Sequence, residues 1–202
     1  MPRVSAERLQ SREKELVAAA RSVFAAKGFE NSAISDIAQA AGVSDGLLYR
    51  YFDSKRAILQ AVLDDFFAGL IQNLERSVAA ETDFRDRLAV LIREHVGVFI
   101  DDLNLCRLFL VEVRNFEDYF GSETHVLSRR YSSVLMRILE GGIADGQIDP
   151  LIDGRLVRDI LFGGIEHLAW RHILAGQPID AGAITDRMTS LLLFGLLGAQ
   201  HR

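Results

Sequence analysis

Residues 3–149 contain no proline, and this absence constrains the fold more than any other feature of the 202-residue sequence. Proline disrupts helix interiors and collects in turns, so a long proline-free stretch is typical of consecutive helices. Apolar residues recur at helical spacing from the first segment onward, as Leu16, Val17, Ala20 and Phe24 illustrate. We therefore predict an all-α protein of about nine helices.

Capping residues divide the first part of the chain into four predicted helices. The first helix ends at Gly28, and a short second helix begins after Ser32 as its N-cap and ends at Gly42. Ser44 caps a third short helix, and Ser54 starts a long fourth one.

Longer helical patterns follow residue 80, where Asp153 and Asp180 are helix start signals and Pro150 and Pro178 lie in the preceding loops. We predict helices near 83–102, 104–118, 122–145, 153–175 and 180–199.

The predicted last helix is apolar around most of its circumference. Such a helix must be covered on every side, which is difficult at the end of a chain of this size without a second subunit. We therefore expect a homodimer in which helices 153–175 and 180–199 of both copies form a four-helix bundle. An obligate interface of this kind buries about 2,000 Å² or more.

Charge is distributed unevenly along the chain. Residues 1–60 hold nine basic and seven acidic side chains, a net charge of +2, whereas the remainder has a net charge of −7. A mildly basic head on an acidic body is compatible with a nucleic-acid-binding head, although +2 is a small charge for that role. We predict two domains, a small head over residues 1–55 and a larger helical domain over residues 56–202.

The stretch 33–52 has the plan of a helix-turn-helix motif, with two short helices joined by the sequence AGVS. In that motif the second helix enters the major groove and presents its N-terminal residues to base edges. The predicted recognition helix, Asp45 to Tyr51, directs Leu48 and Phe52 inward. Asp45, Gly46, Tyr49 and Arg50 then face outward, and Lys55 supplies a cation for phosphate.

The order of these residues, together with Phe24, Gly28-Phe29 and Ile37-Ala38, resembles the N-terminal domain of the TetR family of transcriptional regulators over about residues 10–65. The resemblance implies a ligand-responsive repressor that binds a palindromic operator, with Ser32 and Lys55 at phosphates and Ser35 at a base or phosphate. Asp45 is acidic where a cation or a neutral group is frequent in the family, so it would either accept from cytosine N4 or cap the helix. Ser35 is small where a long polar residue is frequent, so Arg50 would carry more of the base readout. The implied DNA-binding residues are Ser32, Ser35, Ser44, Asp45, Gly46, Tyr49, Arg50, Tyr51 and Lys55.

The C-terminal half, above all residues 156–176, resembles the fatty-acid-degradation regulators of the same family. This resemblance implies a small hydrophobic ligand, with long-chain acyl-CoA as the first candidate. Aromatic side chains would line its pocket and an arginine would meet its anionic end. Ordinary core packing is the better explanation for most of these aromatic side chains, and a solvated face or ion pairs with Glu112 and Glu117 for the arginines. The predicted ligand-binding residues are Phe99, Phe109, Arg114, Phe162 and Trp170.

Enzyme chemistry finds little support in the sequence. The five histidines form no HExxH pattern, and no phosphate-loop or GxSxG glycine pattern occurs, so we predict no catalytic site, metal or cofactor. The alternative is a helical ligand-binding or enzymatic protein that has lost DNA binding, which the intact Tyr49, Arg50 and Lys55 disfavour.

The single cysteine, Cys106, excludes an intrachain disulfide and indicates a reducing compartment. No apolar stretch approaches the roughly 20 residues of a membrane span, and the first residues have no secretory h-region. We expect a soluble cytoplasmic protein without a membrane partner.

Overall fold

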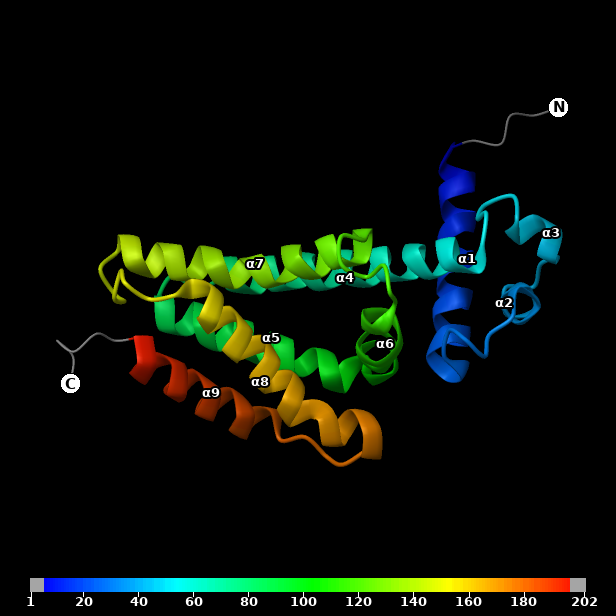
Figure 1. Cartoon of the computed structure of the whole chain (residues 1–202). Helices are drawn as coiled ribbons and strands as arrows, with labels where there is room; N and C mark the ends of the chain where they lie inside the picture. Colours follow the sequence, from blue (N-terminus) through cyan, green and yellow to red (C-terminus); the bar gives the residue numbers. More distant parts are fainter. Residues whose placement is uncertain (1–5, 197–202) are drawn as a thin grey trace. The chain divides into compact units, whose positions relative to one another are not determined.

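The computed structural model describes residues 6–196, and within this range the chain is helical with no β-strand (Figure 1). Nine α-helices, α1 to α9, occur in the described part, together with one π-helical and one 3₁₀ turn. The all-α prediction is therefore confirmed. None of the helices between residues 6 and 196 is long and apolar enough to cross a membrane.

The chain divides into two compact units. The head unit contains the chain up to Phe66 together with Asn104–His125. The body unit contains Phe67–Leu103 and the chain from Val126 onward.

The head unit is built around three N-terminal helices and the first part of a fourth. Glycines end two of them where the predicted stops lie: Gly28 has φ +78° and Gly42 has φ +65°. A side chain is strained at such angles, so glycine suits both turns. Leu16, Phe24 and Ile37 form part of the buried core. The helices are α1 (Ala6–Lys27), α2 (Ile34–Ala40), α3 (Asp45–Leu48) and α4 (Lys55–Ala79).

The predicted N-cap of α2 is wrong by one residue. Ala33 occupies the cap position, and its backbone N–H donates to the Asp36 carboxylate at 2.9 Å. The Ser32 hydroxyl instead donates to the Gly28 carbonyl. The Asp36 carboxylate accepts a hydrogen bond from the cap N–H, as the third residue of a capping box does. The Ser32 hydroxyl closes the preceding turn.

The predicted single helix over 104–118 is also wrong. The chain forms α6 (Leu103–Arg107), a π-helical turn (Leu108–Glu112) and a 3₁₀ turn (Val113–Asn115), and Phe116 is extended. The Phe116 ring packs edge-on against Phe29, with centroids 5.7 Å apart. The helical stretch therefore runs without interruption over 103–115, but it changes from α to π to 3₁₀ and ends before 118.

The body unit is a helical layer in which α5 packs against α8 and α9, and α8 against α9 (Figure 1). The second half of α4 lies alongside α7, and an ion pair of 2.6 Å joins Glu75 to Arg137. The predicted start signals hold: Asp153 accepts from the first N–H groups of α8, and Asp180 accepts from Ala183. The helices are α5 (Phe84–Asp101), α7 (Glu123–Ala144), α8 (Gly154–Ala175) and α9 (Ala181–Leu196). The end of the predicted last helix, 197–199, lies outside the described residues.

Candidate functional site

The turn between α2 and α3 presents the predicted DNA-reading residues. The Ser44 side chain accepts a hydrogen bond from the Leu47 N–H, which confirms Ser44 as the N-cap of α3. The α-helix is shorter than predicted and ends at Leu48, after which Arg50 and Tyr51 donate to carbonyls three residues back. This tighter turn leads directly into the start of α4.

Burial separates the two sides of this segment. Leu48 and Phe52 are buried, whereas Asp45 and Arg50 are exposed and the Tyr49 side chain is 55% exposed. Nothing lies within 4 Å of a Cβ built on Gly46, so its backbone faces open space. The buried pair therefore anchors the segment while its other side stays available to a ligand as large as DNA.

The remaining predicted residues differ in accessibility. Ser35 on α2 and Ser44 are exposed, and Tyr51 is half-buried with its ring 6.5 Å from that of Phe52. Ser32 is buried, with its hydroxyl directed to Gly28.

Lys55 lies at the start of α4 and is engaged by the turn between α1 and α2. Its ammonium donates to the Phe29 carbonyl at 2.8 Å and to the Ser32 carbonyl at 3.0 Å, with a longer contact to Glu30. It also lies 4.3 Å from the centroid of the Phe29 ring. The Lys55 side chain thus holds this turn through hydrogen bonds and a cation–π contact.

Glu112, which lies far along the chain from this turn, also holds it. Its carboxylate accepts a hydrogen bond of 2.8 Å from the Phe29 N–H. A Cβ added to Gly28 would lie 2.6 Å from Glu112 Oε1, so the glycine makes room for this carboxylate. Sequence reasoning assigned Glu112 only a surface ion pair, because no local signal shows which distant N–H a carboxylate will meet.

An ion pair joins the end of α1 to the first turn of α2. Lys27 Nζ lies 2.8 Å from Asp36 Oδ1. The hydrogen bond from Lys27 holds the pKa of Asp36 below its usual value, and the Ala33 N–H contributes in the same direction.

The interior of the body unit contains an aromatic cluster around His95 on α5. The imidazole lies 4.7 Å from the Phe162 ring on α8 and 5.3 Å from Phe99, both nearly edge-on. Its Nδ1 is 3.2 Å from the Tyr131 hydroxyl of α7. Burial lowers the pKa of His95 to about 3, because a protonated imidazole would lose its hydration there.

The predicted ligand-binding residues fall into both units. Phe99 and Phe162 meet around His95, and Trp170 is half-buried on α8 in the same unit. Phe109 and Arg114 belong to the head unit, where Phe109 packs 6.2 Å from Tyr119. Sequence reasoning missed His95, since a single histidine on a helix carries no distinctive pattern.

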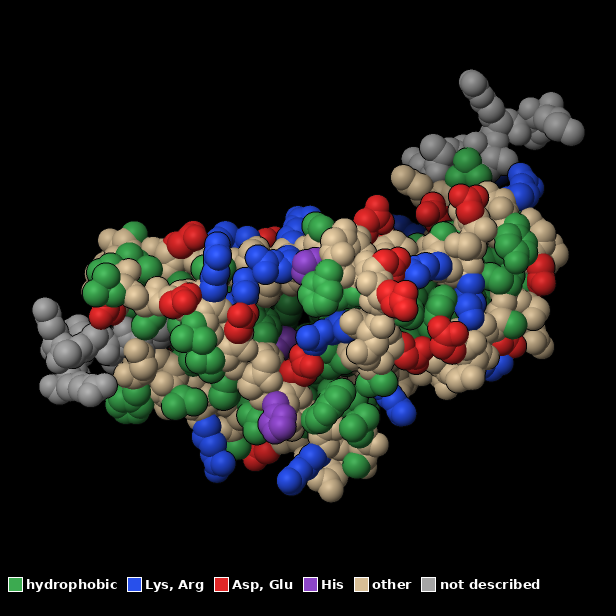
Figure 2. Space-filling view, in the orientation of Figure 1, with side chains coloured by type: hydrophobic (Ala, Val, Ile, Leu, Met, Phe, Trp, Pro, Cys, Tyr) green, Lys and Arg blue, Asp and Glu red, His purple; other side chains and the backbone are tan. Residues whose placement is uncertain are grey.

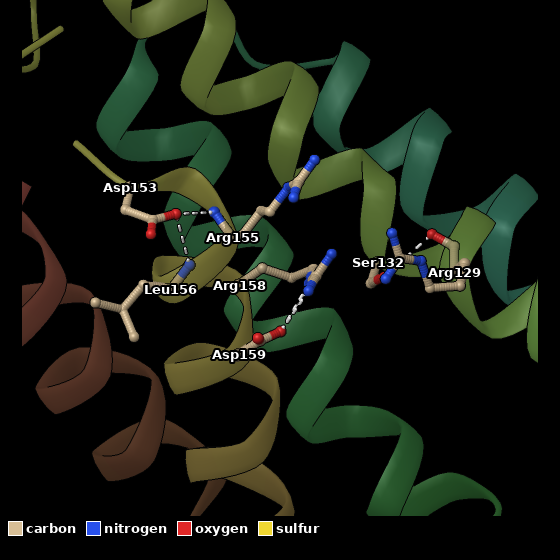
Figure 3. Close-up of polar contacts among 7 residues, drawn as sticks. All are labelled: Arg129, Ser132, Asp153, Arg155, Leu156, Arg158 and Asp159. Atoms are coloured by element: carbon tan, nitrogen blue, oxygen red, sulfur yellow. Dashed lines mark hydrogen bonds and ion pairs between the residues drawn. The ribbon is translucent and has the colours of Figure 1, made fainter. Parts of the chain in front are cut away.

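Arginines from facing helices form a basic cluster in the body unit, which we define as Arg129, Arg155 and Arg158. In Figure 3 the Arg129 side chain of α7 and the Arg158 side chain of α8 extend toward one another. Arg158 donates to Asp159 at 2.8 Å, which neutralises part of this charge. Guanidinium groups that converge in this way favour an anion with several oxygens, such as a phosphate. Figure 2 shows a hollow between α7 and α8, with a histidine side chain inside it.

Apolar side chains are exposed along one side of α8 and on α9. At about 100° per residue, the α8 residues fall within roughly a third of the helix circumference. Gly163 lies on the same side, with open space around its Cβ position. We call this surface the outer apolar face; its residues are Leu156, Ile160, Leu168, Leu174, Leu191 and Phe194.

The fold and these surfaces define a helix-turn-helix DNA-binding protein with a separate helical body. Comparison with known sequences agrees: the model of the bacterial regulatory proteins of the tetR family matches residues 16–62, and that of the C-terminal region of YsiA-like proteins matches residues 63–195. The chain therefore belongs to the TetR family of ligand-responsive, DNA-binding transcriptional regulators, and it is a regulator rather than an enzyme.

Individual relatives cover nearly the whole chain. The fatty acid metabolism regulator protein of Bacillus subtilis is 29% identical over 90% of this chain and 94% of its own length. The transcriptional repressor KstR2 of Rhodococcus jostii is 28% identical over 92% of this chain and 91% of its own. The crystal structure of Bacillus subtilis FadR in complex with stearoyl-CoA has a TM-score of 0.82 and 28% identity, covering 91% of this chain and 98% of that one.

Proposed function

We propose that this chain represses transcription as a homodimer on a palindromic operator, and that a long-chain acyl-CoA releases it. The observation that carries the proposal is the likeness, over nine-tenths of the chain, to a fatty acid metabolism regulator and to a regulator crystallised with stearoyl-CoA. The exposed side of α3 and the basic cluster of the body unit supply the two chemistries that this function needs.

DNA reading is assigned to the exposed residues of the α2–α3 region. Arg50 is exposed, and the guanidinium geometry suits bidentate recognition of guanine. Tyr49 supplies a hydroxyl for a phosphate, and Gly46 lets the backbone approach closely. Ser35, Ser44, Asp45 and Tyr51 complete the surface, with Asp45 placed to accept from cytosine.

Lys55 is proposed to contribute its charge at the phosphate backbone beside this surface, whereas Ser32, which is buried with its hydroxyl bonded to Gly28, is proposed only to hold the preceding turn. Lys55 is half-buried and holds the α1–α2 turn through carbonyl groups, so its positive charge is fixed in place before DNA arrives. A fixed cation adds favourable electrostatic energy at a phosphate with little loss of side-chain entropy.

The homodimer is proposed to form through the outer apolar face. Leu191 is 62% exposed and Phe194 78% exposed in the single chain, and burying such side chains against a second copy is favourable. Gly163 lets the backbones of two α8 helices approach closely. A symmetric dimer places two heads on two half-sites, which is why the operator is palindromic.

The effector is proposed to enter the body unit. Aromatic rings around His95 accommodate an acyl chain, and the basic cluster accommodates the phosphates of coenzyme A. The acyl-CoA acts by binding better to the arrangement of heads that does not fit the operator. We assign residues 1–55 to DNA binding and 56–202 to ligand binding and dimerisation, in a cytoplasmic protein.

Selection from a random duplex library with the full-length protein identifies the operator, and binding is then followed by fluorescence anisotropy. Arg50→Ala lowers affinity for the selected sequence by about 1–3 kcal/mol and relaxes the base preference. Lys55→Ala weakens binding to all sequences and lowers the salt slope by about one. Unchanged operator affinity in a Tyr49/Arg50/Lys55 triple alanine variant overturns the DNA-binding assignment.

Acyl-CoAs of increasing chain length are then titrated into the operator complex. Each buried methylene contributes about 0.8 kcal/mol, so release becomes more efficient with chain length until the chamber is full. Absence of release at every length overturns the acyl-CoA proposal and leaves the regulator assignment intact.

A further inference from the structure

Three buried side-chain polar atoms within residues 6–196 have no hydrogen-bond partner: His95 Nε2, Thr185 Oγ1 and Thr189 Oγ1. All three belong to the body unit, on α5 and α9, which pack against each other. Buried polar atoms are nearly always paired with protein, water or a ligand, because an unpaired one costs free energy. The unpaired Nε2 of His95 is therefore a position at which a polar group of a ligand would be stabilised.

Two of the rings that contact the His95 imidazole are purely hydrocarbon. Phe99 and Phe162 lie edge-on to the imidazole, and their carbon surface cannot accept a conventional hydrogen bond. His95 keeps part of its surface exposed although Nε2 itself is buried, so the ring lies at the border of accessible space. The part of a ligand that reached this nitrogen would be apolar apart from one polar atom.

The tautomer of His95 is coupled to the direction of the hydrogen bond at its other nitrogen. Nδ1 lies 3.2 Å from the Tyr131 hydroxyl, and the depressed pKa keeps the ring neutral at physiological pH. A neutral imidazole has one donor and one acceptor nitrogen. When the Tyr131 hydroxyl donates to Nδ1, the ring proton resides on Nε2.

We propose that His95 Nε2–H is the specificity-determining donor of the effector chamber and binds the thioester carbonyl oxygen of an acyl-CoA. This inference rests on the acyl-CoA effector proposed above. The thioester carbonyl is the acceptor that directly adjoins an acyl chain, so the aromatic rings and the donor recognise neighbouring parts of one molecule. A site built to pair a carbonyl discriminates against a ligand that lacks it, because the donor is then left unpaired.

The test compares palmitoyl-CoA with the hexadecyl thioether of coenzyme A, which has the same chain length but no carbonyl. Binding to the full-length dimer is measured by titration calorimetry. We expect wild type to prefer the thioester by about ten- to a hundredfold. His95→Phe abolishes this preference by weakening the thioester alone, whereas His95→Gln, whose amide N–H replaces Nε2–H, retains part of it.

A spectroscopic measurement separates this role from packing. Nitrogen-15 NMR of histidine-labelled protein reports the tautomer, and the Nε2–H resonance of His95 shifts with palmitoyl-CoA but not with the thioether. Thermal unfolding confirms that each variant is folded.

The possible outcomes distinguish the role of His95 from the acyl-CoA effector proposal on which it rests. Equal wild-type affinity for the two ligands, or a preference that persists in His95→Phe, overturns the role of His95 and leaves the acyl-CoA effector standing. Binding of neither ligand to folded wild type overturns the acyl-CoA proposal and the carbonyl contact with it.

Discussion

The Glu112 carboxylate accepts a hydrogen bond from the backbone N–H of Phe29 across 83 positions of sequence. Phe29 lies in the turn that precedes the helix-turn-helix, and the Phe29 carbonyl accepts from Lys55 on the other side. The turn is therefore held by an anion at its N–H and a cation at its C=O. Glu112 belongs to the segment that follows α5 in the chain. This segment therefore helps to position the turn that leads into α2.

Glu112→Ala should destabilise the head unit by about 1–3 kcal/mol, the range for losing a charged partner of a partly buried N–H. Urea unfolding followed by circular dichroism measures this loss, and hydrogen exchange at Phe29 localises it. Glu112→Gln should lose less, since its amide oxygen still accepts. Glu117→Ala, at an exposed site nearby in sequence, is the matched control. Equal stability of the two alanine variants would show that the Glu112 contact contributes nothing.

Gly46→Ala tests the close approach of α3 to DNA. A Cβ at this helical position meets open space, so the variant should be as stable as wild type, or more stable by up to about 1 kcal/mol. Operator affinity measured by anisotropy should fall nevertheless, because the new methyl group occupies space that DNA needs. Gly69→Ala on α4, which also meets open space, should leave affinity unchanged. Full affinity in Gly46→Ala would contradict a close backbone approach.

His95 should make the stability of the body unit depend on pH. Its pKa falls from 6.5 in the unfolded chain to about 3 in the folded state, so between these values the unfolded state binds more protons. The contribution of His95 to the free energy of unfolding is then largest above pH 6.5. It falls on acidification by up to about 1.4 kcal/mol per pH unit. Among the described contacts of the ring, the Tyr131 hydroxyl lies 3.2 Å from Nδ1.

The comparison that isolates this effect is wild type against His95→Gln, which does not titrate. Urea unfolding at pH 7, 6 and 5 should show a steeper loss for wild type, and the difference should appear only below about pH 6.5. Parallel pH profiles for the two proteins would mean that His95 is accessible to protons in the folded state.

Leu156→Glu combined with Phe194→Glu should disrupt the dimer. Both side chains are exposed in the single chain, and a carboxylate buried in a dimer interface would lose its hydration without a partner. Light scattering at micromolar concentration should give twice the chain mass for wild type and a lower mass for the double variant. Val126→Glu changes an equally exposed apolar residue on α7 and should leave the mass unchanged. A wild-type monomer would refute the dimer.

Local patterns determined most of the helices. Gly28 and Gly42 stop helices where their positive φ angles are needed, and Ser44, Asp153 and Asp180 accept from the first N–H groups of theirs. These signals act within one turn of helix, so a single sequence contains all the information that they require. The order of residues through 33–55 likewise identified the family, and that order lies wholly in the sequence.

Tertiary structure decided the contacts between residues that lie far apart in the chain. It gave the predicted 104–118 helix successive α, π and 3₁₀ turns and an earlier end, paired Glu112 with Phe29, and engaged Lys55 with carbonyl groups that its helix position did not reveal. It also gathered Phe99, Tyr131 and Phe162 from three helices around His95. Helical periodicity says which side of a helix is buried but not what it is buried against. Partners separated by tens of residues are chosen by packing of the whole chain, and this choice set the surroundings of each charged or polar group.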